Sequence, residues 1–245
     1  MKLNLLAGAA LVGVFAASGA YAAQADTGWY GAIDAGGHEM QAMSLHAGGD
    51  PTLVARANTD TDWTGFARIG YKVAPHVRVE LEGGYRPGNL RSVTGTDSSG
   101  FSALCAVNPP AGTCPRPAGS VENFSLMGNL LFDILPDGAV DPFIGGGAGI
   151  AHVRVQANGR VLGLAPPQNV TVDDSDTKFA WQGIAGLAFR VSDQLNVDLT
   201  YRYIATQDIN FTSVGSGVGP ASFQPGVING KYSDQSVTIG LRYLF

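Results

Sequence analysis

Charged residues in this chain alternate with apolar ones, and this spacing points to ion pairing on one face of an extended segment. The clearest case is residues 76–86, where Arg78, Glu80, Glu82 and Arg86 alternate mainly with valine, leucine, glycine and tyrosine. Successive side chains of a β-strand point to opposite faces, so these four charges share one face. An unpaired buried charge costs several kcal/mol, so such a face must pair opposite signs if it is enclosed.

A second group contains the residue types of a catalytic triad. His38, Ser44, His46 and Asp50 lie close together in the sequence. Their spacing fixes no geometry. A segment of this composition also collects such residues by chance. We therefore predict that the chain is not an enzyme and has no catalytic residue and no cofactor.

Three acidic residues form the remaining candidate for ligand chemistry. Asp173, Asp174 and Asp176 could bind a divalent cation of the kind that bridges lipopolysaccharide. A solvated acidic loop is the commoner explanation for such a run, and we expect no metal site.

Eight segments of alternating polarity must position the charged residues. They lie at about 29–37, 62–73, 76–86, 121–134, 141–156, 177–191, 194–206 and 232–245. The connections after the second, fourth and sixth segments are a few residues long. The other connections run to roughly twenty to thirty residues and are rich in turn-forming residues. Short turns at one end and long loops at the other predict an all-β fold, an eight-stranded antiparallel transmembrane β-barrel. A soluble β-sandwich or lipocalin-like barrel is the alternative.

Composition and aromatic placement agree with a barrel. Only 14% of the residues are charged and the net charge is −5, which gives no footprint for nucleic acid. We expect two aromatic belts, as at the two surfaces of a membrane. One belt contains Trp29, Tyr71, Phe132, Phe143, Phe189 and Tyr243. The other contains Trp63, Tyr85, Phe124, Phe179, Trp181 and Tyr203.

The N-terminal segment predicts export. Lys2 precedes an apolar run at 3–17, and Ala20-Tyr21-Ala22 matches a small-x-small cleavage site. We predict a signal peptide at 1–22 and a barrel domain at 23–245. The mature chain has no apolar run of the roughly 18 residues that a transmembrane helix needs.

These features resemble the OmpA-type and opacity-protein-like outer-membrane barrels. The resemblance rests on the signal peptide, Gly70-Tyr71, Val79–Tyr85, the glycine-rich segment Pro142–Gly149 and the closing Tyr243-Leu244-Phe245. It implies location in the cell outer membrane, without the peptidoglycan-binding domain of full-length OmpA proteins. It also implies lipopolysaccharide, phospholipid and the barrel-assembly machinery as partners. Tyr243 and Phe245 would then be the assembly signal, and the uninterrupted apolar belt favours a monomer.

The predicted barrel encloses the charged face. The expected interior network is Asp34, Arg68, Lys72, Arg78, Glu80, Glu82, Arg86, Asp198, Arg202 and Arg242, with Asp133, Arg154 and Arg190 on the same face. An eight-stranded barrel is just wide enough for side chains to fill it. We expect Glu80 and Glu82 to pair with Arg68, Arg202 or Arg242 and to occlude the lumen. The predicted function is therefore structural and surface-exposed, contributing to envelope integrity, and a narrow porin for small solutes is the alternative.

The two cysteines indicate a disulfide. Cys105 and Cys114 lie in the second long connection, and in an exported protein this spacing predicts a small closed loop. Loop closure would contribute about 2–3 kcal/mol to ordering that loop rather than to the barrel.

Overall fold

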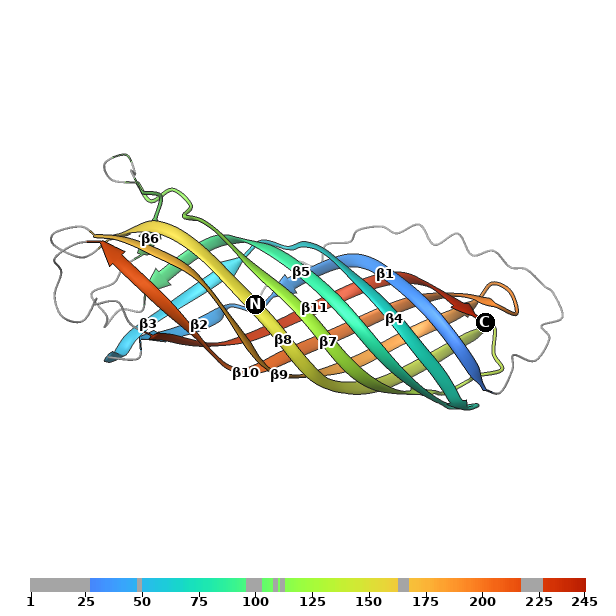
Figure 1. Cartoon of the computed structure of the whole chain (residues 1–245). Coiled ribbons are helices and arrows are strands. Elements are labelled where there is room, and N and C mark those ends of the chain that lie inside the picture. The colour runs from blue at the N-terminus through green and yellow to red at the C-terminus, as the bar shows by residue number, and fades with distance from the viewer. Residues whose placement is uncertain are drawn as a thin grey trace.

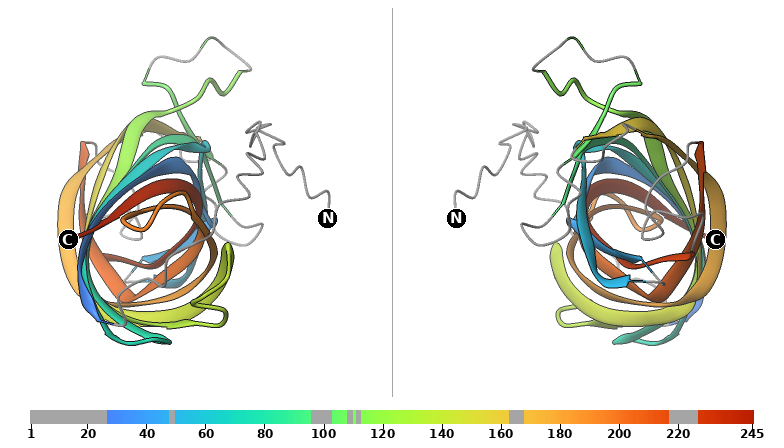
Figure 2. Two further views of the ribbon diagram at one scale, coloured as in Figure 1. Left: turned by 90° about the vertical axis from the view of Figure 1, so that its right-hand side faces the viewer. Right: turned by 90° about the vertical axis from the view of Figure 1, so that its left-hand side faces the viewer.

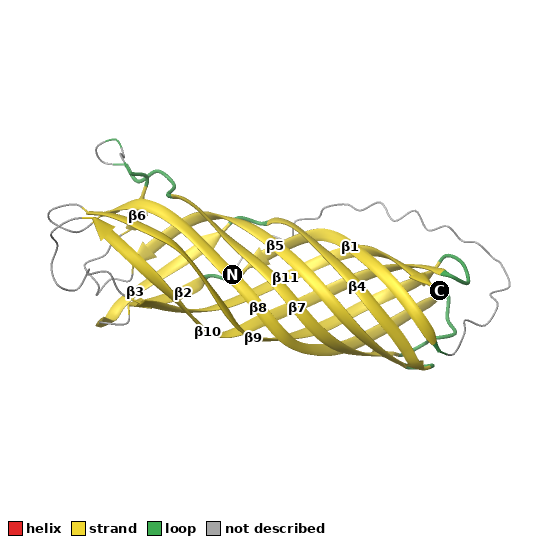
Figure 3. Cartoon of the chain, viewed as in Figure 1, coloured by secondary structure: helices red, strands yellow, loops and turns green. Residues whose placement is uncertain are grey.

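The computed structural model is built from β-strands (Figure 3). It describes residues 27–47, 50–95, 103–107, 110, 113–162, 168–216 and 227–245. The predicted signal peptide at 1–22 therefore lies outside the described residues. In this part of the chain no helix is long and apolar enough to cross a membrane.

Eight strands form a closed ring, which Figure 2 shows end-on. In ring order they are β1 (Gly28–Met40), β4 (Asp62–Ala74), β5 (Val77–Gly95), β7 (Ala118–Asp133), β8 (Val140–Leu162), β9 (Gln168–Arg190), β10 (Leu195–Ser216) and β11 (Val227–Leu244). Each strand pairs antiparallel with the next, and β11 pairs with β1 to close the ring. The predicted eight-stranded antiparallel barrel is confirmed.

Three short strands lengthen the barrel at the end away from the C-terminus (Figure 1). They are β2 (Met43–Ala47), β3 (Asp50–Thr59) and β6 (Ala103–Cys105). Beyond the end of β1, β2 pairs with β11, and beyond β4, β3 pairs with β5. The short β6 lies between β5 and β8, in line with β7. The wall therefore continues past the ends of three ring strands.

The barrel has two halves of opposite polarity, and β8 passes through both. From Val140 to Ile150 its outward positions include exposed isoleucines, Ile144 and Ile150. From Ala151 to Leu162 its inward positions are apolar and buried, whereas outward residues such as Arg154 are exposed. We call the part of the wall level with 140–150 the inner half. The part level with 151–162 is the outer half.

This reversal explains why the predicted strands were too short. The alternation predicts a fifth segment that ends near residue 156 and a sixth that begins near 177, but β8 extends to Leu162 and β9 begins at Gln168. Most of the predicted third outer loop is therefore barrel wall. The alternation continues through it, but the apolar residues face inward, so a pattern written for a lipid-facing strand misses them.

Phe143 corrects the predicted inner belt. It is 1% exposed and faces the interior, because the alternation in β8 places Pro142 and Ile144 on the outside. The glycines that follow on both faces hide this register from a sequence pattern.

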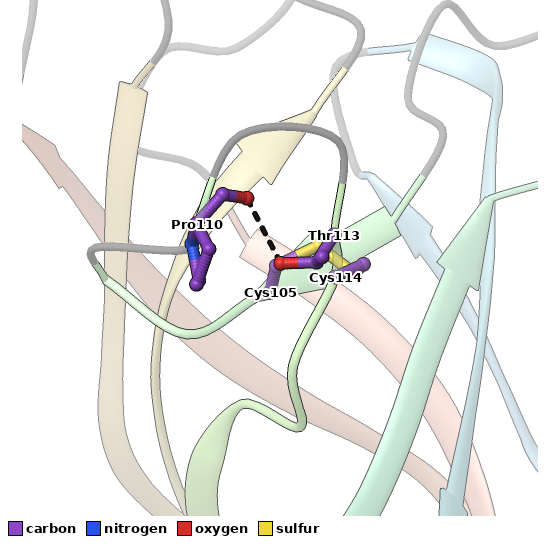
Figure 4. Close-up of a disulfide and its surroundings, with 4 residues drawn as sticks. All are labelled: Cys105, Pro110, Thr113 and Cys114. Carbon is purple, nitrogen blue, oxygen red and sulfur yellow. Dashed lines mark hydrogen bonds between the residues drawn. A yellow bond between two sulfur atoms is a disulfide. The ribbon is translucent and has the colours of Figure 1, made fainter.

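The predicted disulfide is confirmed, and it joins the last residue of β6 to the segment that precedes β7 (Figure 4). On β8, Asn158 pairs with Ala118 of β7, and Arg160 pairs with Cys105 of β6. Between β6 and β7, the Cys105–Cys114 bond and the backbone bond from Ala106 N to Pro115 O, 3.0 Å, join the residues that follow β6 to those that precede β7. Contrary to the expectation that it orders only the loop, the disulfide also aligns two pieces of one wall strand.

Candidate functional site

The interior of the inner half holds a network of buried ion pairs centred on Arg68. Arg68 donates to both oxygens of Asp34 at 2.7 and 2.8 Å, to Glu80 Oε1 at 3.0 Å and to Asp198 Oδ2 at 3.0 Å. Its side chain is 1% exposed and those of Asp34 and Asp198 are not exposed at all. One guanidinium on β4 therefore binds carboxylates from three other strands across the lumen.

A second layer lies on the outer side of this centre. Arg202 Nε donates to Glu82 Oε2 at 2.9 Å, and Arg202 Nη2 donates to Asp34 Oδ2 at 3.1 Å. The other oxygen of Glu82 accepts from Gln182 Nε2 at 2.9 Å. The two layers share Asp34, so they form one connected network.

The network continues toward the turn end of the barrel. Arg78 makes a forked contact with Asp133 at 2.6–2.9 Å, which is the geometry that suits a guanidinium and a carboxylate. Its guanidinium carbon lies 4.9 Å from the centre of the Phe143 ring. Arg242 Nη2 reaches Asp198 Oδ1 at 3.2 Å. Charges thus cross the lumen at several levels.

A buried histidine, His38, lies at the outer boundary of the network. His38 Nδ1 lies 2.7 Å from Asp234 Oδ2, and His38 Nε2 lies 2.5 Å from the carbonyl oxygen of Pro87. Both ring nitrogens therefore face acceptors. The guanidinium carbons of Arg86 and Arg202 lie 4.7 and 4.3 Å from the centre of the Phe66 ring.

Glycines on neighbouring strands make room for these side chains. A Cβ on Gly240 would lie 1.8 Å from Asp34 Oδ1, and a Cβ on Gly70 would lie 2.3 Å from the Tyr30 ring. These glycines are thus needed for close approach, because a larger residue would displace a buried carboxylate or the tyrosine that donates to Glu80 at 2.7 Å.

The structure places all ten residues of the expected network in the interior, each buried: Asp34, Arg68, Lys72, Arg78, Glu80, Glu82, Arg86, Asp198, Arg202 and Arg242. Lys72 makes no ion pair within the described residues. The expectation for Arg154 was wrong, because it lies in the outer half, where its side chain is 48% exposed and faces Asp173.

Sequence reasoning missed Asp234, Tyr30 and Gln182. The alternation of inward and outward positions along each strand could have identified all three. Asp234 has the same parity as Arg242 on β11, and Tyr30 has the same parity as Asp34 on β1. Gln182 alternates with the outward Trp181 on β9.

The outer half has an apolar interior. Its buried cluster includes methionine, valine, leucine, isoleucine and aromatic side chains from most of the wall strands. Members below 4% exposure include Met43, Leu90, Val153, Val161, Ile204, Ile209, Phe211 and Tyr232. Outward neighbours are polar, so this half is built like the core of a soluble protein.

The wall of the outer half has a seam between β9 and β10. The ladder pairs Thr206 with Ala180 and resumes only at Ser213 with Val172. Across the gap, Asp176 Oδ2 accepts from Asn210 N at 2.9 Å, and Asp174 Oδ2 accepts from Thr212 N at 2.8 Å. These carboxylates replace backbone carbonyls as hydrogen-bond acceptors.

The seam shifts the titration of both carboxylates. The hydrogen bonds from the backbone of Thr212 and Ser175 lower the pKa of Asp174. At Asp176 partial burial raises the pKa, but hydrogen bonds from Asn210 N and from Lys178 outweigh it, so the pKa is lowered.

The acidic run is thus part of strand β9 rather than a solvated loop. Asp173 points away from the other two toward Arg154, and no cluster of three metal-ligating side chains occurs in the described ranges. The candidate triad is also not assembled. His38 is buried against Asp234, whereas Ser44 and His46 are exposed on β2.

Aromatic residues ring the outside of the inner half at both ends. At the turn end Trp29 contacts Tyr71 with ring centres 5.2 Å apart. At the other end Trp63 contacts Tyr85 at 5.6 Å, and Trp181 contacts Tyr203 at 5.7 Å. Eight residues of β4 separate Trp63 from Tyr71. At a rise of about 3.3 Å and a tilt near 40° they span about 20 Å, close to the roughly 25 Å apolar band of outer-membrane barrels.

An apolar band between aromatic rings, around a charged interior, is the arrangement of a barrel that crosses a membrane. A family model for the outer membrane protein beta-barrel domain matches residues 7–245. The chain belongs to this family. It is an outer-membrane barrel protein, and the expected location in the outer membrane is confirmed.

Two relatives match most of this outer-membrane barrel. A putative adhesin of Rickettsia typhi is 26% identical over 99% of both chains. An outer membrane protein of Gluconacetobacter diazotrophicus is 27% identical over 89% of this chain, which spans only 58% of that relative. PagN, an outer membrane protein of Salmonella typhimurium, is 29% identical over 52% of this chain and 49% of its own.

Solved structures show the same fold. OprG of Pseudomonas aeruginosa superposes with a TM-score of 0.52 at 14% identity, covering 89% of this chain and 97% of its own. The outer membrane protease OmpT of Escherichia coli gives a TM-score of 0.54 at 10% identity, with the same coverage. At these identities the likeness concerns the fold alone.

Proposed function

We propose that this protein is a closed, non-conducting barrel that contributes to outer-membrane integrity and extends beyond the membrane surface as a rigid outer half. The observation that carries the proposal is the presence of two different fillings in series along one lumen. The inner half is filled by the Arg68 network, and the outer half by the apolar cluster around Ile209 and Phe211.

The charged filling obstructs passage by its connectivity. Arg68, Arg202 and Arg78 each bind carboxylates from other strands, so a passing ion must break several charge-assisted hydrogen bonds at once. Removing one partner leaves an uncompensated buried charge, which is strongly unfavourable.

The apolar filling obstructs passage by dehydration. Ile204 and Ile209 are not exposed at all, and Phe211 is 2% exposed. Ions and polar solutes lose their hydration in a packed apolar interior without gaining hydrogen bonds. Such a core also makes the outer half rigid.

The outer half extends the barrel well beyond the outer aromatic ring. On β9, thirteen residues separate Trp181 in the outer aromatic ring from Gln168 at the strand's far end. With a rise of about 3.3 Å and a tilt near 40°, the wall stands about 30 Å above that ring. A surface role also agrees with the name of the Rickettsia typhi relative, a putative adhesin. We propose no enzymatic role.

The alternative function is a narrow conduit for small solutes. It is favoured by buried polar atoms without a protein partner within the described residues, among them Glu80 Oε2 and Asn129 Nδ2. Such atoms are satisfied by internal water, which would be the start of a polar path. The apolar outer core lies across that path, so we favour the closed barrel.

Single-channel conductance in a planar bilayer tests the proposal. The refolded protein, shown to be folded by its heat-dependent mobility on a gel, should insert and give no discrete openings. Reproducible openings of uniform size would establish the conduit instead. A variant that removes one carboxylate of the ionic filling, Glu82→Ala, should remain silent because the apolar core is intact.

A further inference from the structure

A polar cleft of about 540 Å³ opens on the outside of the barrel, just beyond the outer aromatic ring. It lies at the break between the end of β1 and the start of β2, beside the paired strands β3 and β5. Its polar lining includes Glu39, Gln41, Thr59, Arg91, Ser92 and Gln235. The outer wall of a barrel is normally a flat ladder, so a cleft here needs a structural cause.

Two irregularities in the wall produce the cleft. Gln41 and Ala42 belong to neither β1 nor β2, and Gln41 N bonds to Ser233 O at 2.9 Å. On the other side, the β3–β5 register shifts between Asn58 and Thr59. Irregularities of this kind bend strands and redirect side chains, and in folded proteins they recur next to binding sites.

The polar groups of the cleft are incompletely satisfied. Within the described residues, Glu39 and Arg91 are exposed and have no ion-pair partner, although both line the same cleft. Thr59 is only 8% exposed, yet its hydroxyl makes no hydrogen bond. This hydroxyl is enclosed by the protein, so Glu39 and Arg91 rather than Thr59 are the groups that a ligand in the open cleft would contact.

The position of the cleft restricts what can occupy it. Glu39 lies two residues beyond Gly37, which pairs with Trp63 of the outer aromatic ring. Gln235 pairs with Tyr203 of the same ring. The cleft therefore opens within about 10 Å of the apolar band, at the level of the outer-leaflet headgroups.

We propose that this cleft binds the core saccharide of lipopolysaccharide, with the acyl chains of the same molecule lying along the apolar band below. Sugar hydroxyls both donate and accept hydrogen bonds. The guanidinium of Arg91 supplies donors, the carboxylate of Glu39 supplies acceptors, and the amides and hydroxyls supply both. The mixture of one cation, one anion and neutral polar groups suits a polyhydroxylated ligand better than a bare phosphate. This site lies on the barrel wall, so it does not depend on whether the lumen conducts.

The test compares binding of two probes to the purified full-length chain in detergent. The probes are lipopolysaccharide that bears core sugars and lipid A that lacks them. The double variant Arg91→Ala with Glu39→Gln should weaken binding of the core-bearing form about tenfold or more and leave lipid A binding unchanged. The matched control, Arg154→Ala with Asp173→Asn, alters an exposed pair elsewhere on the outer half and should change neither.

A second variant separates recognition from folding. Gln41→Ala removes one exposed amide of the cleft, so the barrel should retain its heat-dependent mobility while binding of the core-bearing form weakens severalfold. Equal affinity of the native protein for both probes would overturn the proposal. Loss of lipid A binding in parallel with the core-bearing form would overturn it as well, because the groups would then recognise the phosphates. Unchanged binding of the core-bearing form in both cleft variants would also overturn the proposal.

Discussion

The inner and outer halves of this barrel continue the same strands but have opposite polarity. In the inner half Ile144 and Leu241 face outward and Arg68 faces inward, whereas in the outer half Arg154 faces outward and Val153 faces inward. The strand pairing continues through the change. Backbone hydrogen bonding is therefore common to both halves, and the side chains adapt each half to its solvent.

The difference shows which interaction stabilises each half. Lipid surrounds the inner half, so burying apolar side chains in its interior gains little relative to leaving them outside. Its interior is instead joined by ion pairs between strands. Water surrounds the outer half, so an apolar core there gains the usual hydrophobic stabilisation. Substitutions that exchange the two types of interior should therefore act differently in the two halves.

The largest effect is expected from removing the centre of the ionic network. Arg68→Met leaves the carboxylates of Asp34, Glu80 and Asp198 without their shared partner, and should lower the free energy of unfolding by about 3–5 kcal/mol. Urea titration of the folded fraction in lipid vesicles measures this. The exposed Arg154→Met should cost less than about 1 kcal/mol. Equal losses would show that the interior network contributes no more than a surface pair.

A slightly smaller and local effect is expected in the outer half. Ile209→Ala opens a cavity in the apolar core and should cost about 2–4 kcal/mol. Amide hydrogen exchange should rise in the outer part of β8, near Val153, and stay unchanged near Ile144. Leu199→Ala, on the same strand but facing lipid, is the matched control and should change neither region. Faster exchange along the whole of β8 would contradict the separation into halves.

The disulfide should act only in the outer half. Replacing Cys105 and Cys114 with serine releases a short closed loop, and should lower local stability there by about 2–3 kcal/mol. The expected result is faster exchange in β6 and at Val93, because β6 pairs with that part of β5. Reduction of the unchanged protein should give the same pattern. A protein that no longer folds its inner half would contradict this account.

The smallest effect concerns the seam between β9 and β10. The pKa values of Asp174 and Asp176 are lowered in the folded protein, so their contribution to stability is present above the unfolded value of about 3.9 and is lost as pH falls through the folded value. Below about pH 4, residues 207–212 should therefore exchange faster than the inner part of β10, after correction for intrinsic rates.

Alanine at both seam positions should produce the same opening at neutral pH. Asp173→Ala is the matched control, because that carboxylate faces Arg154 rather than the seam. A seam that exchanges slowly in the double variant would show that the carboxylates do not hold it.

The sequence predicted the features that depend on strict alternation. The hairpin around residues 70–86 and the interior position of Glu80 and Glu82 follow from parity alone. Parity also identified Arg202 and Arg242 as inward residues. The partner of each charge did not follow, because the choice among several arginines depends on the register and tilt of the closed barrel.

The features that were missed have physical causes. The sequence pattern predicts loops in place of the outer wall, because the apolar side of this wall faces inward. Beyond the bulge at Ala205–Asp208 on β10, the inward positions change from even to odd numbers, which hides Ile209 and Phe211. The cleft at Thr59 and Arg91 arises from interruptions in pairing, which no local pattern of residue types encodes.

The polarity of the barrel wall reverses along a single strand, and accessibility measured site by site along β8 can detect this reversal. Both described cysteines are disulfide-bonded, so single cysteines at Ile144, Ile150, Arg154 and Asn158 can carry spin labels in the unreduced protein. All four positions face outward. We expect labels at 144 and 150 to be accessible to oxygen in lipid, and labels at 154 and 158 to be accessible to a water-soluble nickel complex. Lipid accessibility at all four positions would contradict it.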